Sequence, residues 1–313
     1  MMKNLKFLFL SLVAIMMFAL VACGNEADNE NVQNNDHEDE VPSSVTLTDD
    51  TGTEVTIEGD VDRIISLIPS TTEMVFALGL GDKVVGVSEF DNFPAEVTDI
   101  EKVIGMEADV EKIVELEPDL VLADIINGDA ITQLREQGLT VFAIESNNLE
   151  EVFEDITSIG ELTGASEKAE AVVSDMKETR DNVVATIEGV PADERKTVYI
   201  ETGEGFYSIG SGTFMANLLS IAGGENIFAD QEGWLQASEE SVLEENPDVI
   251  FITYGAYMDD AVGSVLNRAN WENITAIQEE QVYELTSDLV SRPGPRVVEG
   301  LREMAEYLYP DQF

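Results

Sequence analysis

Histidine and cysteine are nearly absent from this chain of 313 residues, which contains one of each. Cys23 follows an apolar stretch and His37 lies in a polar segment, so we expect neither in the folded body of the protein. A body without these residue types has no Ser-His-Asp triad, no disulfide, and no zinc, iron or copper site built on Cys or His. The chemistry that remains is that of carboxylates, hydroxyls, arginines and aromatic rings, or binding without catalysis.

Basic residues are also scarce, with 16 Lys and Arg against 64 Asp and Glu and a formal net charge of -48. A surface that binds nucleic-acid phosphates needs clustered Lys or Arg, so we expect no DNA or RNA partner. Such an excess of one charge repels itself unless salt screens it. We therefore hypothesise a saline or alkaline habitat, with a merely acidic soluble surface as the alternative. A melting temperature no higher in about 2 M than in about 0.1 M salt would contradict this hypothesis.

The first residues have the pattern of a bacterial export signal. Lys3 and Lys6 precede the apolar run 7–21, which is short for a membrane-spanning helix. The run ends in Leu-Val-Ala-Cys-Gly at 20–24, which resembles the lipobox of bacterial lipoproteins, where the cysteine is lipidated. A membrane-spanning anchor is the alternative.

These features predict a lipid-anchored protein on the outer face of the cell membrane. Residues 1–22 are then the signal peptide, and Cys23 is the lipidated N-terminus. The segment 23–44 is rich in Asn, Asp and Glu and poor in large apolar residues, which predicts a disordered acidic tether. His37 lies within this tether, so we expect no ligand role for its imidazole.

The rest of the chain alternates apolar runs with amphipathic stretches, which is typical of an α/β fold with parallel sheets. The segment 63–68 predicts a buried strand, and Pro-Ser-Thr-Thr-Glu at 69–73 predicts a helix start capped by a hydroxyl. Hydrophobic residues make up 44% of the sequence, which suits one large or two medium domains.

One pattern of helix, proline and strand occurs twice, at 111–121 and, 129 residues later, at 240–250. In each copy the proline ends the helix, because it disfavours helical geometry in the residue before it, and an apolar strand follows. Chance use of the same pattern is the alternative. Two copies at matching places predict two Rossmann-like α/β lobes, at 45–165 and 191–313, with a ligand cleft between them.

A single helix is predicted to join the lobes. Residues 166–188 contain neither Gly nor Pro and predict a helix of up to about 34 Å, at about 1.5 Å per residue. We assign a linking helix to 166–190. Because one long helix makes a stiff hinge, we expect the cleft to close little on a ligand.

Five segments together resemble the helical-backbone (class III) substrate-binding proteins of ABC importers, which carry cobalamin, haem and iron-siderophore chelates. They read Ile-Ser-Leu-Ile-Pro-Ser-Thr-Thr-Glu at 65–73, Phe-Ala-Leu-Gly-Leu-Gly at 76–81, Pro-Asp-Leu-Val at 118–121, Gly-Gly-Glu-Asn-Ile-Phe at 223–228 and Ser-Arg-Pro-Gly-Pro-Arg at 291–296. The resemblance spans about residues 45 to 313 and is greatest to the cobalamin-binding members and their lipoprotein relatives.

The resemblance implies a monomeric lipoprotein that captures a cobalamin-like corrinoid or an iron chelate and delivers it to an ABC permease with its ATPase. It implies no catalysis, no cofactor and no resident metal. An iron-siderophore or haem receptor of the same fold, with Tyr207 as a haem ligand, is the alternative. A secreted hydrolase with paired carboxylates is more distant, because no motif supports it and no acid lies in evidently apolar or aromatic surroundings. A surface adhesion or sensor module is a third possibility.

The resemblance also implies that one glutamate of each lobe faces the permease, and the matching residues are Glu111 and Glu240. A carboxylate early in a helix is favoured by the helix dipole and can accept two hydrogen bonds from an arginine. The alternative is that these acids only keep the surface solvated.

For the ligand, the resemblance places Phe90, Tyr207 and Trp234 at or near positions that contact the corrin, and Asp288 and Arg292 in the polar loop beneath it. A large flat ligand with polar edges needs aromatic faces and a few donors and acceptors. The alternative for each aromatic ring is a place in the hydrophobic core.

Two arginines of the C-terminal lobe, Arg292 and Arg296, lie in one loop that contains Pro and Gly. In so acidic a chain they can bind an anionic siderophore or the propionates of haem. They can equally hold the C-terminal helix by ion pairs, and for Arg296 we favour this structural role.

Overall fold

The computed structural model describes residues 44–313. The predicted signal peptide, Cys23, His37 and the tether up to residue 43 lie outside the described residues. Within residues 44–313, no helix combines the length and the apolar character needed to cross a membrane.

The N-terminal lobe is built on a five-stranded parallel sheet with the order β5-β4-β3-β6-β7. Its strands are β3 (Ile64–Ser66), β4 (Val84–Ser88), β5 (Lys102–Ile104), β6 (Leu120–Asp124) and β7 (Val141–Ile144). Its helices are α1 (Pro69–Ala77), α2 (Val110–Glu115), α3 (Asp129–Glu136) and α4 (Leu149–Leu162), with the short 3-10 helices η1 (Gly81–Lys83), η2 (Ala95–Asp99) and η3 (Ile125–Asn127). An antiparallel hairpin of β1 (Ser44–Thr48) and β2 (Glu54–Glu58) precedes the sheet and contacts α4.

The C-terminal lobe has a four-stranded parallel sheet with the order β10-β8-β12-β13. Its strands are β8 (Thr197–Glu201), β10 (Glu225–Asn226), β12 (Val249–Ile252) and β13 (Val282–Glu284), and β9 (Tyr207–Ile209) and β11 (Trp234–Gln236) form a separate antiparallel ribbon. Its helices are α6 (Phe214–Ile221), α7 (Glu239–Glu245), α8 (Ala261–Leu266), α9 (Thr275–Gln278), α10 (Ser287–Ser291) and α11 (Val297–Leu308), with η4 (Ala192–Glu194) and η5 (Gly255–Tyr257).

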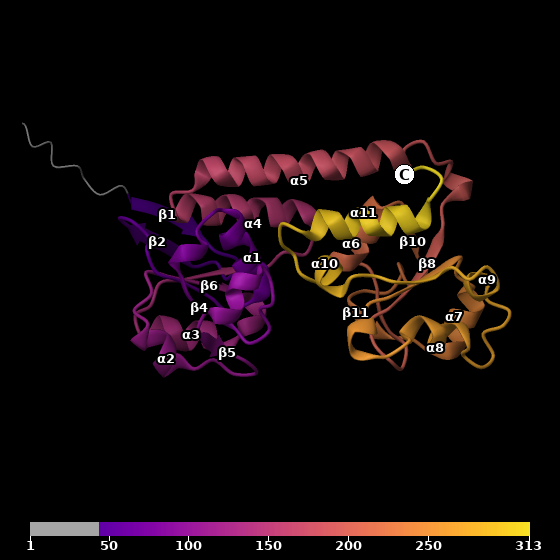
Figure 1. Cartoon of the computed structure of the whole chain (residues 1–313), viewed down its shortest axis with the longest axis horizontal. Coiled ribbons are helices and arrows are strands. Elements are labelled where there is room, and N and C mark those ends of the chain that lie inside the picture. Colours follow the sequence, from indigo (N-terminus) through magenta and orange to yellow (C-terminus); the bar gives the residue numbers. More distant parts are fainter. Residues whose placement is uncertain (1–43) are drawn as a thin grey trace, which may run out of the picture. The chain divides into compact units, whose positions relative to one another are not determined.

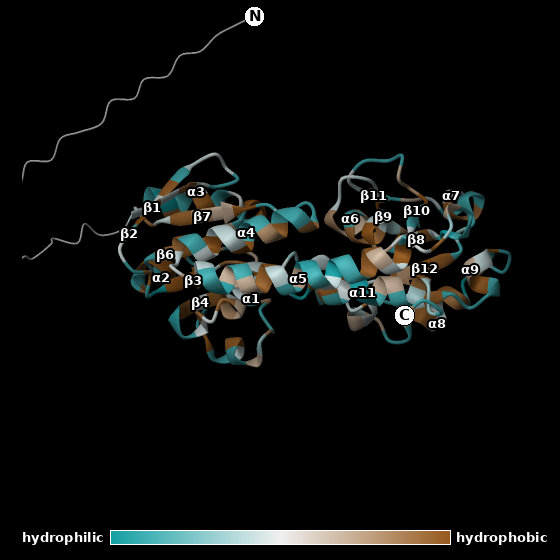
Figure 2. Cartoon of the chain, turned by 90° about the horizontal axis from the view of Figure 1, so that it is seen from above, coloured by the Kyte–Doolittle hydropathy of each residue, from teal (hydrophilic) through white to brown (hydrophobic). Residues whose placement is uncertain are grey.

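The helix α5 (Ser166–Ile187) joins the two lobes. It packs against α4 of the first lobe and against α6 and α11 of the second, and Figure 1 shows it running along both. Figure 2 shows many hydrophilic residues on α5, yet its buried Met176 belongs to one hydrophobic core together with Val152 of α4 and Leu301 of α11. The expected fold class, two α/β lobes joined by a long helix, is therefore confirmed.

The two copies of the repeated pattern occupy equivalent places in their sheets. The strand of the first copy, β6, lies between β3 and β7, and the strand of the second copy, β12, lies between β8 and β13. The residue before the proline has the same left-handed backbone in both copies, with φ of 46° at Glu117 and at Asn246. Each helix thus ends before its proline as predicted, although the residue before the proline is left-handed and does not have the extended backbone that a following proline favours.

The aspartate after the proline also has one role in both lobes. The carboxylate of Asp119 accepts hydrogen bonds from the backbone nitrogens of Asp62 and Arg63, just before β3, each at 2.8 Å. The carboxylate of Asp248 accepts a bond of 2.9 Å from the backbone nitrogen of Thr197, at the start of β8. Each aspartate therefore fixes the start of the neighbouring central strand.

The start of α1 corrects one expectation. The N-cap residue is Ile68, whose side chain cannot cap, and Pro69 occupies the first helical position. The hydroxyls of Thr71 and Thr72 lie inside the first turn and donate to the carbonyl of Ile68 instead. A proline at the first position pre-sets the helical φ, so this helix begins without a hydroxyl cap. Gly79, with φ of 77°, follows its end, where a left-handed glycine is common.

Candidate functional site

Loops at the carboxyl ends of the N-terminal strands line a cavity of about 670 Å³. They follow β3, β4, β5 and β6, and they include Pro69, Phe90, Met106, Ile126 and Asp129. The carboxyl ends of parallel strands are where α/β sheets bind ligands. This cavity is therefore the N-terminal half of the candidate site.

Three large apolar side chains on these loops are exposed. The exposed fraction is 55% for Phe90, 93% for Met106 and 77% for Ile126. Exposed apolar side chains gathered at one cavity mark a binding surface. Phe90 was a candidate from the sequence, whereas Met106 and Ile126 were missed, although Ile126 follows the strand predicted in the first copy of the repeat.

The C-terminal lobe presents aromatic rings at its own strand ends. Tyr207 is 50% exposed, Trp234 is 67% exposed, and Tyr257 of η5 is 90% exposed. In the antiparallel ribbon, Trp234 pairs with Ile209, so Tyr207 and Trp234 lie diagonally on the same face. The structure thus brings the two predicted aromatic residues of this lobe together and adds Tyr257, which follows β12.

The two lobes are connected by a polar cluster that we call the interlobe clasp, made of Glu73, Asn92, Asp288, Arg292 and Arg296. Glu73 of α1, with only 3% of its side chain exposed, accepts two hydrogen bonds from Arg296, at 2.8 and 2.6 Å. Its carboxylate also lies 3.4 Å from a guanidinium nitrogen of Arg292. The bonds to Glu73 raise the pKa of Arg296 above its usual value.

Arg292 and Asp288 have partners within the clasp. Arg292 lies 2.9 Å from a carboxylate oxygen of Asp288 and donates a bond of 2.7 Å to the side-chain oxygen of Asn92. The amide nitrogen of Asn92 in turn donates to Asp288, at 2.9 Å. The structure therefore brings these two predicted site residues together, but the charge of Arg292 is already balanced by protein carboxylates. Arg296, the N-cap residue of α11, agrees with the favoured structural role, since its ion pair with Glu73 holds the start of the C-terminal helix to α1.

A second polar cluster is centred on Arg268, next to Phe206, the residue before the aromatic ribbon. Arg268 makes two hydrogen bonds to the fully buried carboxylate of Glu201, at 2.9 and 3.0 Å. Its guanidinium lies 4.3 Å from the ring centre of Trp271 and 5.1 Å from that of Phe206. Burial and the charge of Glu201 raise the pKa of the nearby Tyr254 to about 12.

The expectation that no acid lies in apolar or aromatic surroundings is wrong for Glu201, which is buried among aromatic rings. Asp155 of α4 is also buried, with 8% exposed, but its neighbours include the acids Asp50, Glu145 and Glu151. Burial is the main cause that raises the pKa of Asp155 to about 7, and the charges of Asp50 and Glu151 add to it, although a hydrogen bond from Ser146 opposes the shift. Both burials arise from packing between segments far apart in sequence, which single-chain patterns do not reveal.

Glu111 and Glu240 have equivalent positions in the two lobes. Each is the second residue of its helix, α2 or α7, and each side chain is exposed. The helices are capped by Asp109 and Ser238, whose side chains accept bonds from backbone nitrogens of the first turn. Figure 1 shows α2 and α7 on the side of each lobe away from α5. Among residues 44–313 neither glutamate forms an ion pair.

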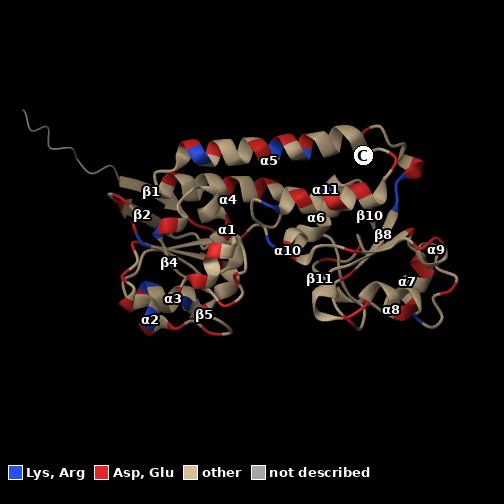
Figure 3. Cartoon of the chain, in the orientation of Figure 1, with Lys and Arg blue, Asp and Glu red and all other residues tan. Residues whose placement is uncertain are grey.

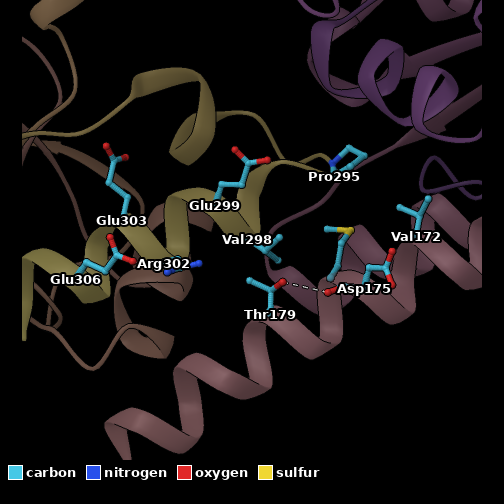
Figure 4. A pocket seen from close by; sticks show the side chains of 10 residues that line it. Val172, Asp175, Thr179, Pro295, Val298, Glu299, Arg302, Glu303 and Glu306 are labelled. Atoms are coloured by element: carbon cyan, nitrogen blue, oxygen red, sulfur yellow. Dashed lines mark hydrogen bonds and ion pairs between the residues drawn. The ribbon is translucent and has the colours of Figure 1, made fainter. Parts of the chain in front are cut away.

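A separate hollow of about 650 Å³ lies between α5 and α11 (Figure 4). Its walls are one face of each helix, with Val172, Asp175 and Thr179 from α5 and Val298 and Arg302 from α11. Pro295, in the loop between α10 and α11, also lines it. In the part of the chain from 44 to 313, no group of His, Cys, Asp and Glu side chains could hold a metal ion.

Comparison with known proteins gives four concordant matches. The family model described as periplasmic binding protein matches residues 64–289. The chain is 40% identical to an uncharacterized ABC transporter substrate-binding lipoprotein, YvrC, of Bacillus subtilis, over 97% of this chain and 96% of that protein. It is 32% identical to a cobalamin-binding protein of Halobacterium salinarum, over 96% and 84% of the two chains. The crystal structure of a possible iron-binding (periplasmic solute-binding) protein of Staphylococcus epidermidis has a TM-score of 0.72 and 30% identity, over 80% of this chain and 99% of that one.

Proposed function

Because this chain belongs to the periplasmic binding protein family, we propose that it is the substrate-binding protein of an ABC importer. In this role it captures a cobalamin-like corrinoid or an iron chelate outside the cytoplasm and delivers it to a permease that works with an ATPase. The names of its relatives support both ligand classes. We favour the corrinoid, with an iron-siderophore or haem as the second candidate.

This proposal is supported above all by the exposed apolar and aromatic side chains that lie at the strand ends of both lobes. Phe90 faces the cavity of the first lobe, and Tyr207 and Trp234 share one face of the ribbon in the second. A planar metal complex offers such rings a broad surface to stack on. Asp288 and Arg292 lie at the junction of the lobes and supply the polar contacts beneath the ligand.

The same proposal assigns no catalytic step to the chain. We propose a monomer without cofactor, held at the outer face of the cell membrane by a lipid on Cys23. The relative of Bacillus subtilis, which carries the name lipoprotein, supports this anchor.

Ligand titration followed by tryptophan fluorescence tests the proposal, because the two tryptophans differ sharply in exposure. Trp234 is 67% exposed at the ribbon, whereas Trp271 is fully buried. We expect cyanocobalamin, or else a ferric siderophore or haem, to quench Trp234. A Trp234→Phe variant should lose most of the quenching, and a Trp271→Phe variant should keep it. A chain that binds none of the three ligand classes would contradict the proposed function.

We further propose that Glu111 and Glu240 dock the protein on arginines of the permease. Their exposure, their equivalent helical positions and the shared side of the lobes support this role. Reversing both charges, with Glu111→Arg and Glu240→Arg, should abolish import in cells and leave the ligand affinity of the isolated protein unchanged. Loss of ligand binding would contradict a docking role.

A matched control is present on the same two helices. Glu115 and Glu244 are also 129 residues apart and exposed, but they lie at the other end of α2 and α7. The pair Glu115→Arg and Glu244→Arg changes the net charge equally, so import that fails in this variant as well would point to a general charge effect.

A further inference from the structure

We infer that the ligand of this site carries no net negative charge, so that it is a neutral or cationic metal complex and not an anionic one. The inference rests on the proposed function and narrows its ligand class. We draw it from the charged side chains at the carboxyl ends of the strands in both lobes. Among residues 44–313, every cation at this edge forms an ion pair with a protein carboxylate, whereas several acids form none.

The cations at this edge are already neutralised. The loops that follow the parallel strands contain no lysine and only two arginines, Arg292 and Arg296, and both pair with the buried Glu73. Arg268 lies just after α8, reaches the same edge and is held by both oxygens of Glu201. The side chains of the three arginines are only 16 to 20% exposed. An anionic ligand that took Arg296 or Arg268 would leave a buried carboxylate without its main partner, which is strongly unfavourable. One that took Arg292 would have to compete with Glu73 and Asp288.

The unpaired charges at the cavity of the first lobe are negative. Glu107 and Asp129 line this cavity, and both are exposed. The carboxylate of Glu89 lies so close to Gly105, also in the cavity wall, that a side-chain carbon on Gly105 would come within 2.6 Å of it. Among residues 44–313 none of these three acids forms an ion pair. Figure 3 shows the general excess of acidic over basic residues on both lobes.

The balance of charge decides which ligands can enter. Repulsion between like charges grows when a ligand displaces water from a site, because the local dielectric constant falls. A neutral or cationic complex avoids this repulsion and still gains contact with the exposed apolar side chains, such as Met106 and Trp234. An anionic catecholate, a citrate chelate or haem with its propionates meets three unpaired carboxylates and no free cation.

Two pairs of probes that share their shape and differ in charge test the inference. The first pair is cyanocobalamin, which is neutral, and its derivative with peripheral amides hydrolysed to carboxylates. The second is ferrioxamine B, a cationic ferric trihydroxamate, and its N-succinyl derivative, which is anionic. In whichever pair binds, we expect the neutral or cationic member to bind at least about tenfold more tightly in about 0.05 M salt. The ratio should shrink in about 0.5 M salt, because the screening length becomes shorter.

A variant with Glu89→Gln, Glu107→Gln and Asp129→Asn should reduce the ratio of affinities, between the neutral or cationic probe and its anionic partner, by about tenfold. All three side chains are exposed, so the fold should tolerate the changes. An anionic member that binds the native protein as tightly as its partner at low salt would overturn the inference and leave the proposed importer function standing. Tight binding of a ferric tris-catecholate would do the same.

A control variant keeps the change in net charge and moves it away from the site. Glu58→Gln, Asp60→Asn and Glu136→Gln alter exposed acids at the end of β2, before β3 and at the end of α3, on the amino side of the strands. In this control variant, the ratio of affinities between the two probes of a pair should be the same as in the native protein. An equal narrowing in both variants would mean that total charge alone selects the ligand, which contradicts the inference. Failure of all four probes and the catecholate to bind would contradict the proposed function as well.

Discussion

The two lobes repeat one backbone plan but differ in the side chains that fill it. Each lobe buries a carboxylate against an arginine, yet the surroundings are not alike. Asp49 in the first lobe pairs with Arg135 and accepts further bonds from backbone nitrogens around it. Glu201 in the second lobe pairs with Arg268 among aromatic rings. The first ion pair holds the hairpin to the sheet, whereas the second supports the loop that leads to the aromatic ribbon.

This difference separates folding from ligand choice. The features that recur, namely the proline, the aspartate after it and the left-handed residue before it, all fix strands. The features that differ lie at the strand ends, where the first lobe offers Phe90 together with the exposed Met106 and Ile126 and unpaired acids, and the second offers three exposed aromatic rings. The lobes therefore contribute different side chains to the site, and the interlobe clasp holds the two sets of side chains in position relative to each other.

The largest expected effect comes from breaking the clasp. Glu73→Ala removes the carboxylate that both Arg292 and Arg296 share and leaves two mostly covered cations without it. We expect the free energy of unfolding to fall by about 3 to 5 kcal/mol, as for other buried ion pairs that lose one partner. Urea unfolding at neutral pH measures this loss. Glu170→Ala, an exposed acid on α5, is the control and should change stability by less than about 0.5 kcal/mol; equal losses would show that the clasp does not hold the lobes.

A pH-dependent effect should follow from Asp155, which has no counterpart in the second lobe. Its pKa is about 7 in the folded protein and about 3.9 in an unfolded chain, so the folded state keeps a proton that the unfolded state releases. The free energy of unfolding should therefore fall as the pH rises from about 4 to about 7. Asp155→Asn removes this loss and should be more stable than the native protein at pH values above about 7, by up to about 4 kcal/mol.

Thermal unfolding of both proteins across this pH range gives the measurement. The neighbouring Glu154 is exposed on the same helix, so Glu154→Gln should follow the native pH dependence. If Asp155→Asn also follows it, burial does not hold the proton on Asp155.

The fold could be predicted from the sequence because its signals are local or repeated. The pattern of helix, proline and strand, repeated after 129 residues, predicted both central strands, and a stretch without Gly or Pro predicted α5. The clasp could not be predicted, since Glu73 and Arg296 are 223 residues apart and no pattern in either segment indicates which residue pairs with it. Met106 and Ile126 were missed because a single apolar residue in a loop has no periodicity to distinguish it from the core. Roles in ligand contact for Phe90 and Trp234 stay predictions.

A smaller effect tests whether the repeated aspartates are equivalent. Asp119→Ala and Asp248→Ala each remove a carboxylate that fixes the start of a central strand. We expect losses of about 1 to 2 kcal/mol in the free energy of unfolding, and values for the two variants within about 0.5 kcal/mol of each other. Urea titration of both variants would measure them, and a loss confined to one lobe would break the equivalence.

The smallest effect concerns the residue before each proline, where the lobes differ by one side chain. Both positions have φ of 46°, but Glu117 is a residue that disfavours this left-handed conformation, whereas Asn246 tolerates it. Glu117→Gly should raise the free energy of unfolding by about 0.5 to 1 kcal/mol, because relief of backbone strain exceeds the entropy that glycine adds to the unfolded chain. Asn246→Gly should lower the free energy of unfolding instead, since little strain is relieved and the side chain of Asn246 donates a hydrogen bond of 3.0 Å to the hydroxyl of Thr275 and accepts one of 2.9 Å from the backbone nitrogen of Thr275. Melting temperatures of the two variants decide the matter, and an equal gain in both would mean that the strain at Glu117 does not exceed that at Asn246.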